Sequence, residues 1–431
     1  MISCNLKKKL LPSVMAAALI SGVTLGGSVS AVEVAADATG QVLLAPIFYV
    51  KNEGQVTSIK VINTSFTHAV KARIAFRSRI NSTEVLDFII YLSPGDIWRG
   101  EVINVDGQSW VTSKDDSVRN LPNADSFASV EGKMANVQMF DAALSANDDN
   151  EMGHFEVIGA YSVTGFIAVP TPTNVPTSVQ VRQGMSKFEL AKIFDTPIAT
   201  LLSLNNCVAG ATAGCNIRTD DPSSVQLRGE VSLSLAGDKF GYEMTALDND
   251  AATGLVISNP FYDVAVRLSV DLGANFAGPG IDNILNIETA LAAANFGASY
   301  QNNSEGTSFT LVTFPTKYRH FKSDPCVSGS TANWTPPFTP QGTISYLINQ
   351  LDNQEHGVIN ADISVSGSLA APGAKITPEV EWFLPKWKFE SGWYSLVLNP
   401  TVGCPYAGAP AIVNTLNMNG SKSEFIPNSP Y

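Results

Sequence analysis

Paired acidic side chains are the first group in this sequence that could do chemistry. Asp248 and Asp250 flank an asparagine, and further acidic runs stand at 147–151 and 220–221. Carboxylate and amide oxygens placed this close together can bind Ca²⁺, so Asp248 and Asp250 are candidate ligands of a calcium site. None of these runs follows the twelve-residue EF-hand pattern, and an acidic surface turn is the commoner interpretation of such residues. We expect no cofactor other than this calcium.

The cysteines are the second reactive group. Cys4 lies in the leader-like segment described below, which leaves four for the rest of the chain: Cys207, Cys215, Cys326 and Cys404. An even number in an exported chain predicts two disulfides. Cys207 and Cys215 are close enough to close one loop, which leaves Cys326 with Cys404, although the other two pairings stay open. A zinc site is the competing interpretation, but the sequence has neither the Cys-x-x-Cys pair nor the clustered histidines of such a site.

A hydrolytic site would need a nucleophile, a base and an orienting acid. The chain has four histidines, each beside polar residues typical of turns, and no Gly-x-Ser-x-Gly elbow. Sequence does not show which serine any of these histidines would meet. We therefore predict that the protein is not an enzyme, and keep a periplasmic hydrolase as a minor alternative.

The first thirty-one residues predict where the protein works. Three lysines at 7–9 precede an apolar stretch at 10–25, and small residues at 29–31 form a processing site. This order is typical of a secretory signal peptide that is removed after Ala31. No later stretch approaches the roughly 20 apolar residues that cross a bilayer. We expect a secreted protein, at the cell surface or extracellular, with the periplasm as an alternative and no transmembrane segment in the mature chain.

Charge and composition limit the classes of partner and the fold classes that the sequence allows. The leader contains three lysines and no acid, so 24 Lys and Arg stand against 39 Asp and Glu in the remaining chain. This acidity argues against nucleic acid, whose phosphates demand clustered basic residues. Only 15% of the residues are charged, while Gly and Pro are plentiful. Because long helices need charged residues on their wet faces, this balance favours strands and turns.

Short β-branched and aromatic runs, separated by turn residues, occur on both sides of the middle of the chain. Residues 69–76 alternate: Lys71 and Arg73 share one face, and the apolar side chains share the other, as in a half-buried strand. We predict a mainly β fold of two antiparallel β-sandwich-like domains, at 32–169 and 223–431, with a small βαα insertion between them at 170–222.

The insertion has local signals of its own. Residues 170–176 form a Pro/Thr linker, stiff and extended, and a short strand follows at 178–182. Ser186 and Glu189 form a capping box that predicts a helix at 187–194. Thr196 caps a second predicted helix with Pro197 at its first position. The best candidate for a closing strand is Ser223–Val231, and the alternative is that this strand already belongs to the second sheet.

Residues 178–206 resemble the lysin motif, a family of small modules that bind glycans containing N-acetylglucosamine, such as peptidoglycan and chitin. The resemblance is carried by the run 179–186, the Ala-x-x-Phe stretch at 191–194 and the Leu-Asn-Asn ending at 204–206. It implies a sugar groove lined by two turns, whose residues are Gln183, Gly184, Met185, Ser186, Thr196, Pro197 and Ile198. The other interpretation is a helical hairpin whose Leu and Phe side chains are core.

The rest of the chain resembles a group of secreted bacterial cell-surface β proteins, through runs such as 43–46, 85–88, 92–98 and 313–317. Together with export and disulfides, this predicts an exported structural cell-surface or extracellular matrix protein, such as a self-assembling surface-layer or filament subunit. Self-association would use edge strands that add to a neighbour's sheet. The alternative is a peptidoglycan-binding cell-wall protein acting through the lysin-motif-like segment.

Overall fold

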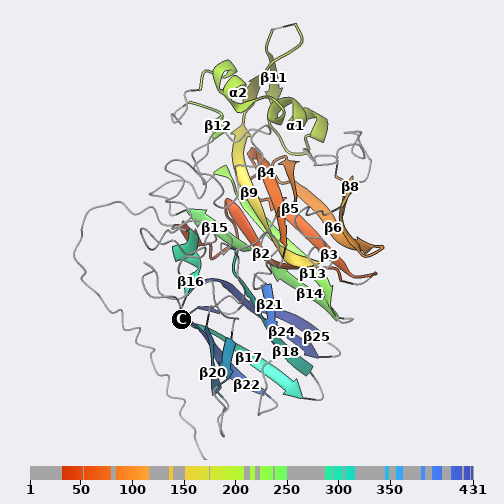
Figure 1. The fold of residues 1–431 in the computed structure, drawn as a ribbon. Helices are drawn as coiled ribbons and strands as arrows, with labels where there is room; N and C mark the ends of the chain where they lie inside the picture. Colours follow the sequence, from red (N-terminus) through yellow and green to blue (C-terminus); the bar gives the residue numbers. More distant parts are fainter. Residues whose placement is uncertain are drawn as a thin grey trace, which may run out of the picture.

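The computed structural model describes the chain in segments (Figure 1), and these are residues 32–51, 53–78, 84–115, 135–138, 151–173, 175–207, 214–218, 224–235, 238–249, 287–293, 295–303, 306–315, 345–348, 356–362, 380–383, 391–399, 409–419, 422–427 and 429–430. The expected signal peptide at 1–31 lies outside these segments. Within them the chain is mainly β, with antiparallel sheets and few helices, which confirms the predicted fold class.

A seven-stranded sheet forms one layer of the first sandwich. Its strand order is β1-β15-β2-β9-β4-β5, with β12 added beside β9, and its pairs are antiparallel. The strands are β1 (Val32–Val34), β2 (Val42–Tyr49), β4 (His68–Ser78), β5 (Glu84–Leu92), β9 (Met152–Thr164), β12 (Ile217–Arg218) and β15 (Thr245–Asn249).

A six-stranded antiparallel sheet forms the second layer, in the order β14-β13-β3-β6-β7-β8. Successive side chains of β3 are alternately buried and accessible, so Ile59 and Val61 face the core while Ser58 and Lys60 face outward. The strands are β3 (Val56–Asn63), β6 (Ile97–Val105), β7 (Gln108–Ser113), β8 (Ala135–Gln138), β13 (Leu227–Leu235) and β14 (Asp238–Glu243).

Aromatic side chains fill the space between the two layers. The Phe76 ring lies 5.0 Å from Phe155 and 5.5 Å from Phe48, centroid to centroid, and Phe88 contacts Trp98 of the opposite layer at 5.7 Å. All five side chains are buried. Truncating one such ring to alanine costs about 3–5 kcal/mol, so this cluster is a major source of the sandwich's stability.

The insertion stands at one end of the sandwich, at the top of Figure 1. It contains β10 (Phe166–Val169), β11 (Thr177–Gln180), α1 (Lys187–Phe194) and α2 (Ile198–Leu204). β10 pairs with β11, so residues 170–176, which we expected to link two domains, join two paired strands. The expected closing strand is also wrong, because β13 pairs with β3 and β14 while the insertion returns to the sheet through β12.

Among the described residues, no helix combines the length and the apolar character needed to cross a membrane.

A third, nine-stranded sheet follows in the chain. Its order is β19-β20-β22-β17-β18-β24-β25, with β21 beside β18 and β26 beside β17, and among its described strand pairs only β20 and β22 are parallel. The strands are β17 (Asn295–Asn303), β18 (Gly306–Thr313), β19 (Ser345–Ile348), β20 (His356–Asp362), β21 (Val380–Phe383), β22 (Ser391–Asn399), β24 (Ile412–Asn419), β25 (Lys422–Pro427) and β26 (Ser429–Pro430), while β16 (Ala292–Ala293) pairs separately with β23 (Ala409–Pro410).

The structure corrects the expected boundary between the β regions. Strands β13, β14 and β15, which we expected in a second domain beginning at 223, complete the two sheets of the first sandwich. The nine-stranded sheet also contacts this sandwich, because Leu311 and Leu416 join its core and Thr313 Oγ1 donates to the Pro46 carbonyl at 2.7 Å. Alternation along one segment does not identify the partner of a strand, so the sequence alone did not assign these strands to the first sandwich.

Candidate functional site

The helices of the insertion cover one end of the outer face of the seven-stranded sheet. Phe194 packs against Tyr91 and Tyr161, with ring centroids 5.1 and 5.5 Å apart. The other apolar side chains that the two helices bury in the same cluster are Leu190, Ile193, Ile198, Leu201 and Leu202. The regularly spaced apolar side chains that the two helices bury therefore pack the insertion onto the sheet.

Lys187 fastens the first turn of α1 to the end of β5. Its Nζ donates to the Tyr91 carbonyl and to Asp96 Oδ2, both at 2.7 Å, and lies 3.4 Å from Asp115 Oδ2. Burial alone would raise the pKa of Asp96, but the Lys187 ammonium and backbone hydrogen bonds outweigh it and hold that pKa below its ordinary value. The Lys187 ammonium thus connects the insertion to the edge strand β5 and to the turn that follows β5.

The charged side chains of β4 are buried, which corrects the expectation of a half-buried strand. Arg73 Nε lies 3.1 Å from Asp87 Oδ2, and Arg77 Nη2 lies 3.1 Å from Glu156 Oε1. Lys71 donates from Nζ to a backbone carbonyl of α1 at 3.2 Å. Each of these side chains is at most 9% exposed. The alternation was recognised correctly, but both faces of this sheet are covered.

His154 lies beside this charged cluster, directly opposite Arg77 in the β4–β9 register. Its side chain is buried, and neither ring nitrogen has a hydrogen-bond partner among the described residues. Desolvation, and then repulsion from Arg77, lowers the pKa of His154 from 6.5 to about 3. The imidazole is therefore neutral in the folded protein at physiological pH.

The structure divides the seven residues of the expected sugar groove between surface and core. The exposed ones are Gln183, Gly184, Ser186 and Pro197, and the buried ones are Met185, Thr196 and Ile198. Gly184 adopts a φ of 66°, which suits the turn before α1. The predicted capping box is present: the Ser186 hydroxyl accepts from the Glu189 backbone N–H, and the Glu189 carboxylate accepts from the Ser186 N–H.

Two polar residues of the insertion have roles that differ from the expected ones. Thr196 does not cap α2, since its Oγ1 donates to the Lys192 carbonyl at 2.9 Å and Pro197 occupies the N-cap. Asn205 binds both backbone groups of Ala168, accepting at 2.8 Å and donating at 3.0 Å. The Asn205 amide thereby pairs with β10 through the same kind of hydrogen bonds as a neighbouring strand would, and it holds the end of α2 against β10.

One of the expected disulfides is present. Cys207 and Cys215 are bonded, with a Cα–Cα distance of 5.4 Å, and the bond closes the loop after α2. Cys326 and Cys404 lie outside the described residues, so their pairing stays a prediction.

The expected calcium ligands are only partly described. Asp248 lies on β15, opposite Glu33 of β1, while Asp250 lies outside the described residues. In the part of the chain that the structure describes, no three His, Cys, Asp or Glu side chains are grouped as metal ligands. The calcium site therefore stays a prediction.

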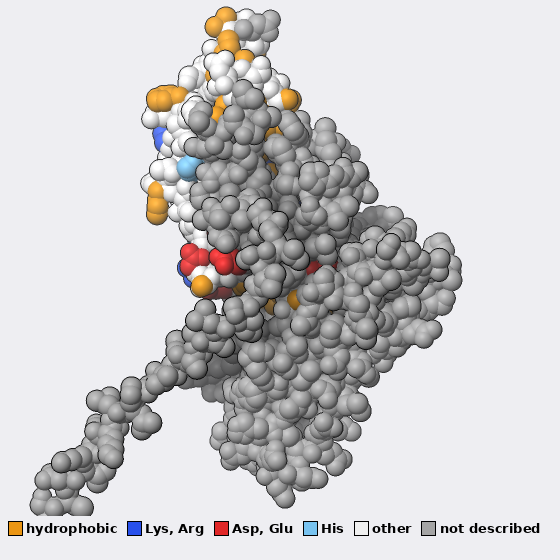
Figure 2. All heavy atoms as spheres, turned by 90° about the vertical axis from the view of Figure 1, so that its left-hand side faces the viewer, with side chains coloured by type: hydrophobic (Ala, Val, Ile, Leu, Met, Phe, Trp, Pro, Cys, Tyr) orange, Lys and Arg blue, Asp and Glu red, His pale blue; other side chains and the backbone are white. Residues whose placement is uncertain are grey.

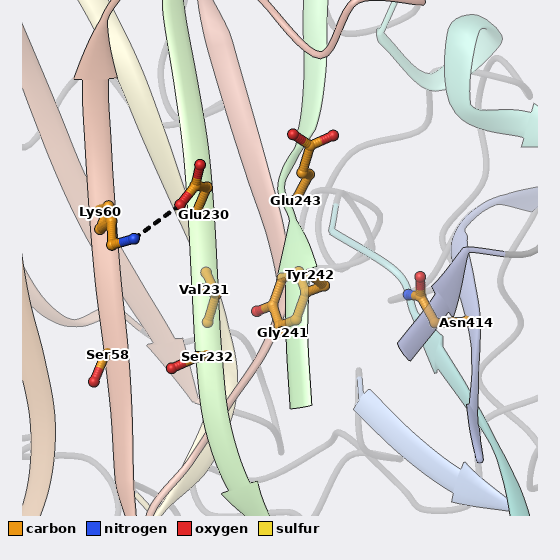
Figure 3. Close-up of a pocket in the computed structure, with 9 residues that line it drawn as sticks. All are labelled: Ser58, Lys60, Glu230, Val231, Ser232, Gly241, Tyr242, Glu243 and Asn414. Carbon is orange, nitrogen blue, oxygen red and sulfur yellow. Dashed lines mark hydrogen bonds and ion pairs between the residues drawn. The ribbon is translucent and has the colours of Figure 1, made fainter. Parts of the chain in front are cut away.

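A polar trough of about 500 Å³ lies on the outer face of the six-stranded sheet (Figure 3). Its floor is a row of small residues on neighbouring strands, namely Ser58, Ser232 and Gly241. Glu243, Glu230 and Lys60 form the next row, with the Lys60 ammonium 3.0 Å from the Glu230 carboxylate. Long side chains beside a row of short ones leave this hollow in the sheet surface.

Asn414 of β24 closes the trough from the nine-stranded sheet (Figure 3). Its side chain is 3% exposed, and its Nδ2 has no hydrogen-bond partner among the described residues. A second hollow, of about 660 Å³, shares Ser58 and Lys60 with the trough and continues across β6 and β7. The two together form a surface lined mainly by polar residue types, and it crosses five strands.

Exposed hydrophobic side chains gather at the insertion end of the molecule, as Figure 2 shows for one face. Phe188 of α1 and Phe166 of β10 are 68% and 61% exposed, and Phe66 in the turn before β4 is 72% exposed. Lys192 lies over the Phe188 ring, 4.7 Å from its centroid. These side chains do not form part of the trough.

No protein-family model, no curated protein and no solved structure matches this chain.

The trough could not be predicted from the sequence. Its residues come from strands that are distant in sequence, such as Lys60 and Glu230, and are common types that no motif distinguishes. The one available signal was the alternation in β3, which assigns Ser58 and Lys60 to the outer face without naming their neighbours.

Proposed function

We propose that this chain is an exported structural protein of the cell surface that associates with further copies of itself. Export is supported by the leader-like residues 1–31 and by the Cys207–Cys215 disulfide, since such bonds form and persist in oxidising compartments. The covered faces of the seven-stranded sheet leave its edges as the places where another strand could add.

The observation that carries the proposal is the edge strand β1. It has only three residues, Val32–Val34, and pairs with β15 on one side, while no described residue pairs with its other side. The Val34 side chain is 46% exposed. Such an edge presents unpaired backbone groups to a second copy of the chain, which can add a strand by the same hydrogen bonds that join strands within a sheet.

The hydrogen bonds between β1 and β15 show which backbone N–H of β1 points away from the sheet. The Ala35 N–H donates to the Ala246 carbonyl at 2.9 Å, in the register of β1 with β15. Because antiparallel pairs alternate between bonded and non-bonded positions, the N–H of Glu33 also points toward β15 and that of Val34 points away. A proline at Val34 therefore removes a donor that only an added strand would use.

Light scattering of the exported, processed protein across a concentration series tests this proposal. We expect association that increases with concentration and is lost in Val34→Pro. Val175→Pro is the matched control, because Val175 is also an exposed valine and lies in the insertion between β10 and β11, which belong to a different sheet from β1. A monodisperse monomer at high concentration would contradict the proposal, as would equal association of Val34→Pro.

The second candidate function is glycan binding by residues 178–206. It is supported by the strand, helix, helix order of the segment and by the exposed turn at Gln183 and Gly184. Deleting the segment would uncover its apolar docking face, so surface substitutions are the better test. We expect Gln183→Ala with Pro197→Ala to reduce pull-down on insoluble peptidoglycan if this function holds, and to leave it unchanged if the segment serves packing alone.

A further inference from the structure

The polar trough has the hydrogen-bonding groups of a ligand-binding site, which a purely structural role does not require. Its floor residues Ser58 and Ser232 present hydroxyl groups that can both donate and accept hydrogen bonds. Glu230 and Glu243 supply acceptors at one wall, and Lys60 supplies donors. The trough therefore offers both kinds of hydrogen-bonding partner within one hollow.

Asn414 provides an independent sign that the trough takes a ligand. An amide group that is buried without a partner is destabilising by about 1–3 kcal/mol, and native proteins seldom leave such a group unused. This Nδ2, which has no hydrogen-bond partner among the described residues, belongs to a side chain that lines the trough, and Figure 3 shows it on the side of Asn414 that faces Tyr242. A ligand with an acceptor at this position would satisfy that donor.

The charges in the trough select against ionic ligands. Lys60 pairs with Glu230, and Arg228 donates a hydrogen bond to Glu243, so the two cations and two carboxylates balance. A phosphate in the trough would face the carboxylates, and a cation would face the Lys60 ammonium. A neutral ligand rich in hydroxyl groups meets neither repulsion, because each hydroxyl both donates and accepts.

The length of the polar surface indicates more than one sugar unit. The second hollow begins at Ser58 and Lys60 and continues to Glu101 and Thr112. Ser58, Glu101 and Thr112 lie directly opposite one another on three successive strands. Five neighbouring strands from β14 to β7 span about 19 Å at a spacing of about 4.8 Å. We propose that this surface binds an uncharged oligosaccharide laid across the strands, with the trough between β3 and Asn414 as its principal subsite.

Gly241→Val is the decisive variant, because it fills the floor of the trough. A Cβ at Gly241 would meet nothing closer than the Val231 carbonyl oxygen at 3.9 Å, so the variant is expected to fold. Asn414→Leu is the second variant: it removes the unpartnered donor at similar volume and is expected to keep or raise the melting temperature. Ser234→Val is the matched control, since Ser234 is accessible on the same face of β13 and outside both hollows.

Titration calorimetry of the full exported chain with cellotetraose, maltotetraose and chitotetraose tests the proposal. We expect at least one of these probes to bind with a Kd of about 1 mM or tighter, Gly241→Val and Asn414→Leu each to weaken it about tenfold or more, and Ser234→Val to leave it unchanged.

Failure of all three probes to bind would overturn the proposal, as would binding that both trough variants retain. Loss of chitotetraose binding only in Gln183→Ala with Pro197→Ala would assign the sugar site to the insertion instead. None of these outcomes depends on self-association, which the Val34→Pro series measures separately.

Discussion

Replacing His154 by leucine should make the folded protein less sensitive to acid. The imidazole is 1% exposed, and its nitrogens have no hydrogen-bond partner among the described residues. Burial and the opposing Arg77 lower its pKa from 6.5 to about 3. The native state therefore excludes a proton that the unfolded chain readily binds, and leucine removes this difference while keeping the site filled.

The sign and size of the effect follow from proton linkage. A group whose pKa is depressed on folding contributes its full stability above its unfolded pKa, and this contribution is lost as the pH falls toward the folded pKa. For His154 the window runs from about pH 6.5 down to about pH 3. Each pH unit within it lowers the free energy of unfolding by about 1.4 kcal/mol, so lowering the pH from 7 to 5 costs about 2 kcal/mol.

Denaturant unfolding followed by tryptophan fluorescence at pH 7 and pH 5 measures this loss. We expect His154→Leu to lose about 2 kcal/mol less than the unmodified chain between these two pH values. His68→Leu is the matched control, because His68 is only partly buried and its Nδ1 lies within hydrogen-bond distance of Ser65 and Thr67 hydroxyls. Equal losses in His154→Leu and the unmodified chain would show that the proton is taken up elsewhere and that His154 is not the source of the acid sensitivity.

Three further predictions concern stability. Lys187→Met should speed amide hydrogen exchange in α1, with a local loss of about 1–3 kcal/mol from its broken ionic hydrogen bonds, whereas the exposed Lys192→Met should not. Replacing Cys207 and Cys215 by serine should lower the free energy of unfolding by about 2–3 kcal/mol, as measured by thermal denaturation against the unmodified chain. Tyr242→Phe removes the hydrogen bond that this buried hydroxyl donates to the Ile47 carbonyl of β2, and denaturant titration should show a loss of about 1 kcal/mol in the free energy of unfolding.

Local signals in the sequence predicted local structure well. The capping box at Ser186 set the start of α1, and the predicted helix at 187–194 has the observed bounds. The alternating run 69–76 likewise lies within β4. Turn residues, caps and alternation act over a few neighbouring residues, so one segment contains all the information that these predictions need.

Long-range structure could not be predicted in the same way. The pairing of β13 with β3 joins residues across the whole insertion, and no local pattern specifies that partner. The burial of Arg73 depends on what covers the outer face of the sheet, which alternation does not reveal. The trough combines both difficulties, since its polar side chains come from separate strands and become neighbours only through the sheet register.

Electron microscopy of the exported, processed protein tests self-association through the β1 edge most directly. We expect ordered assemblies of the unmodified chain that are absent from Val34→Pro and present in Val175→Pro at the same concentration. Isolated single particles of the unmodified chain, or assemblies of equal order in Val34→Pro, would contradict it.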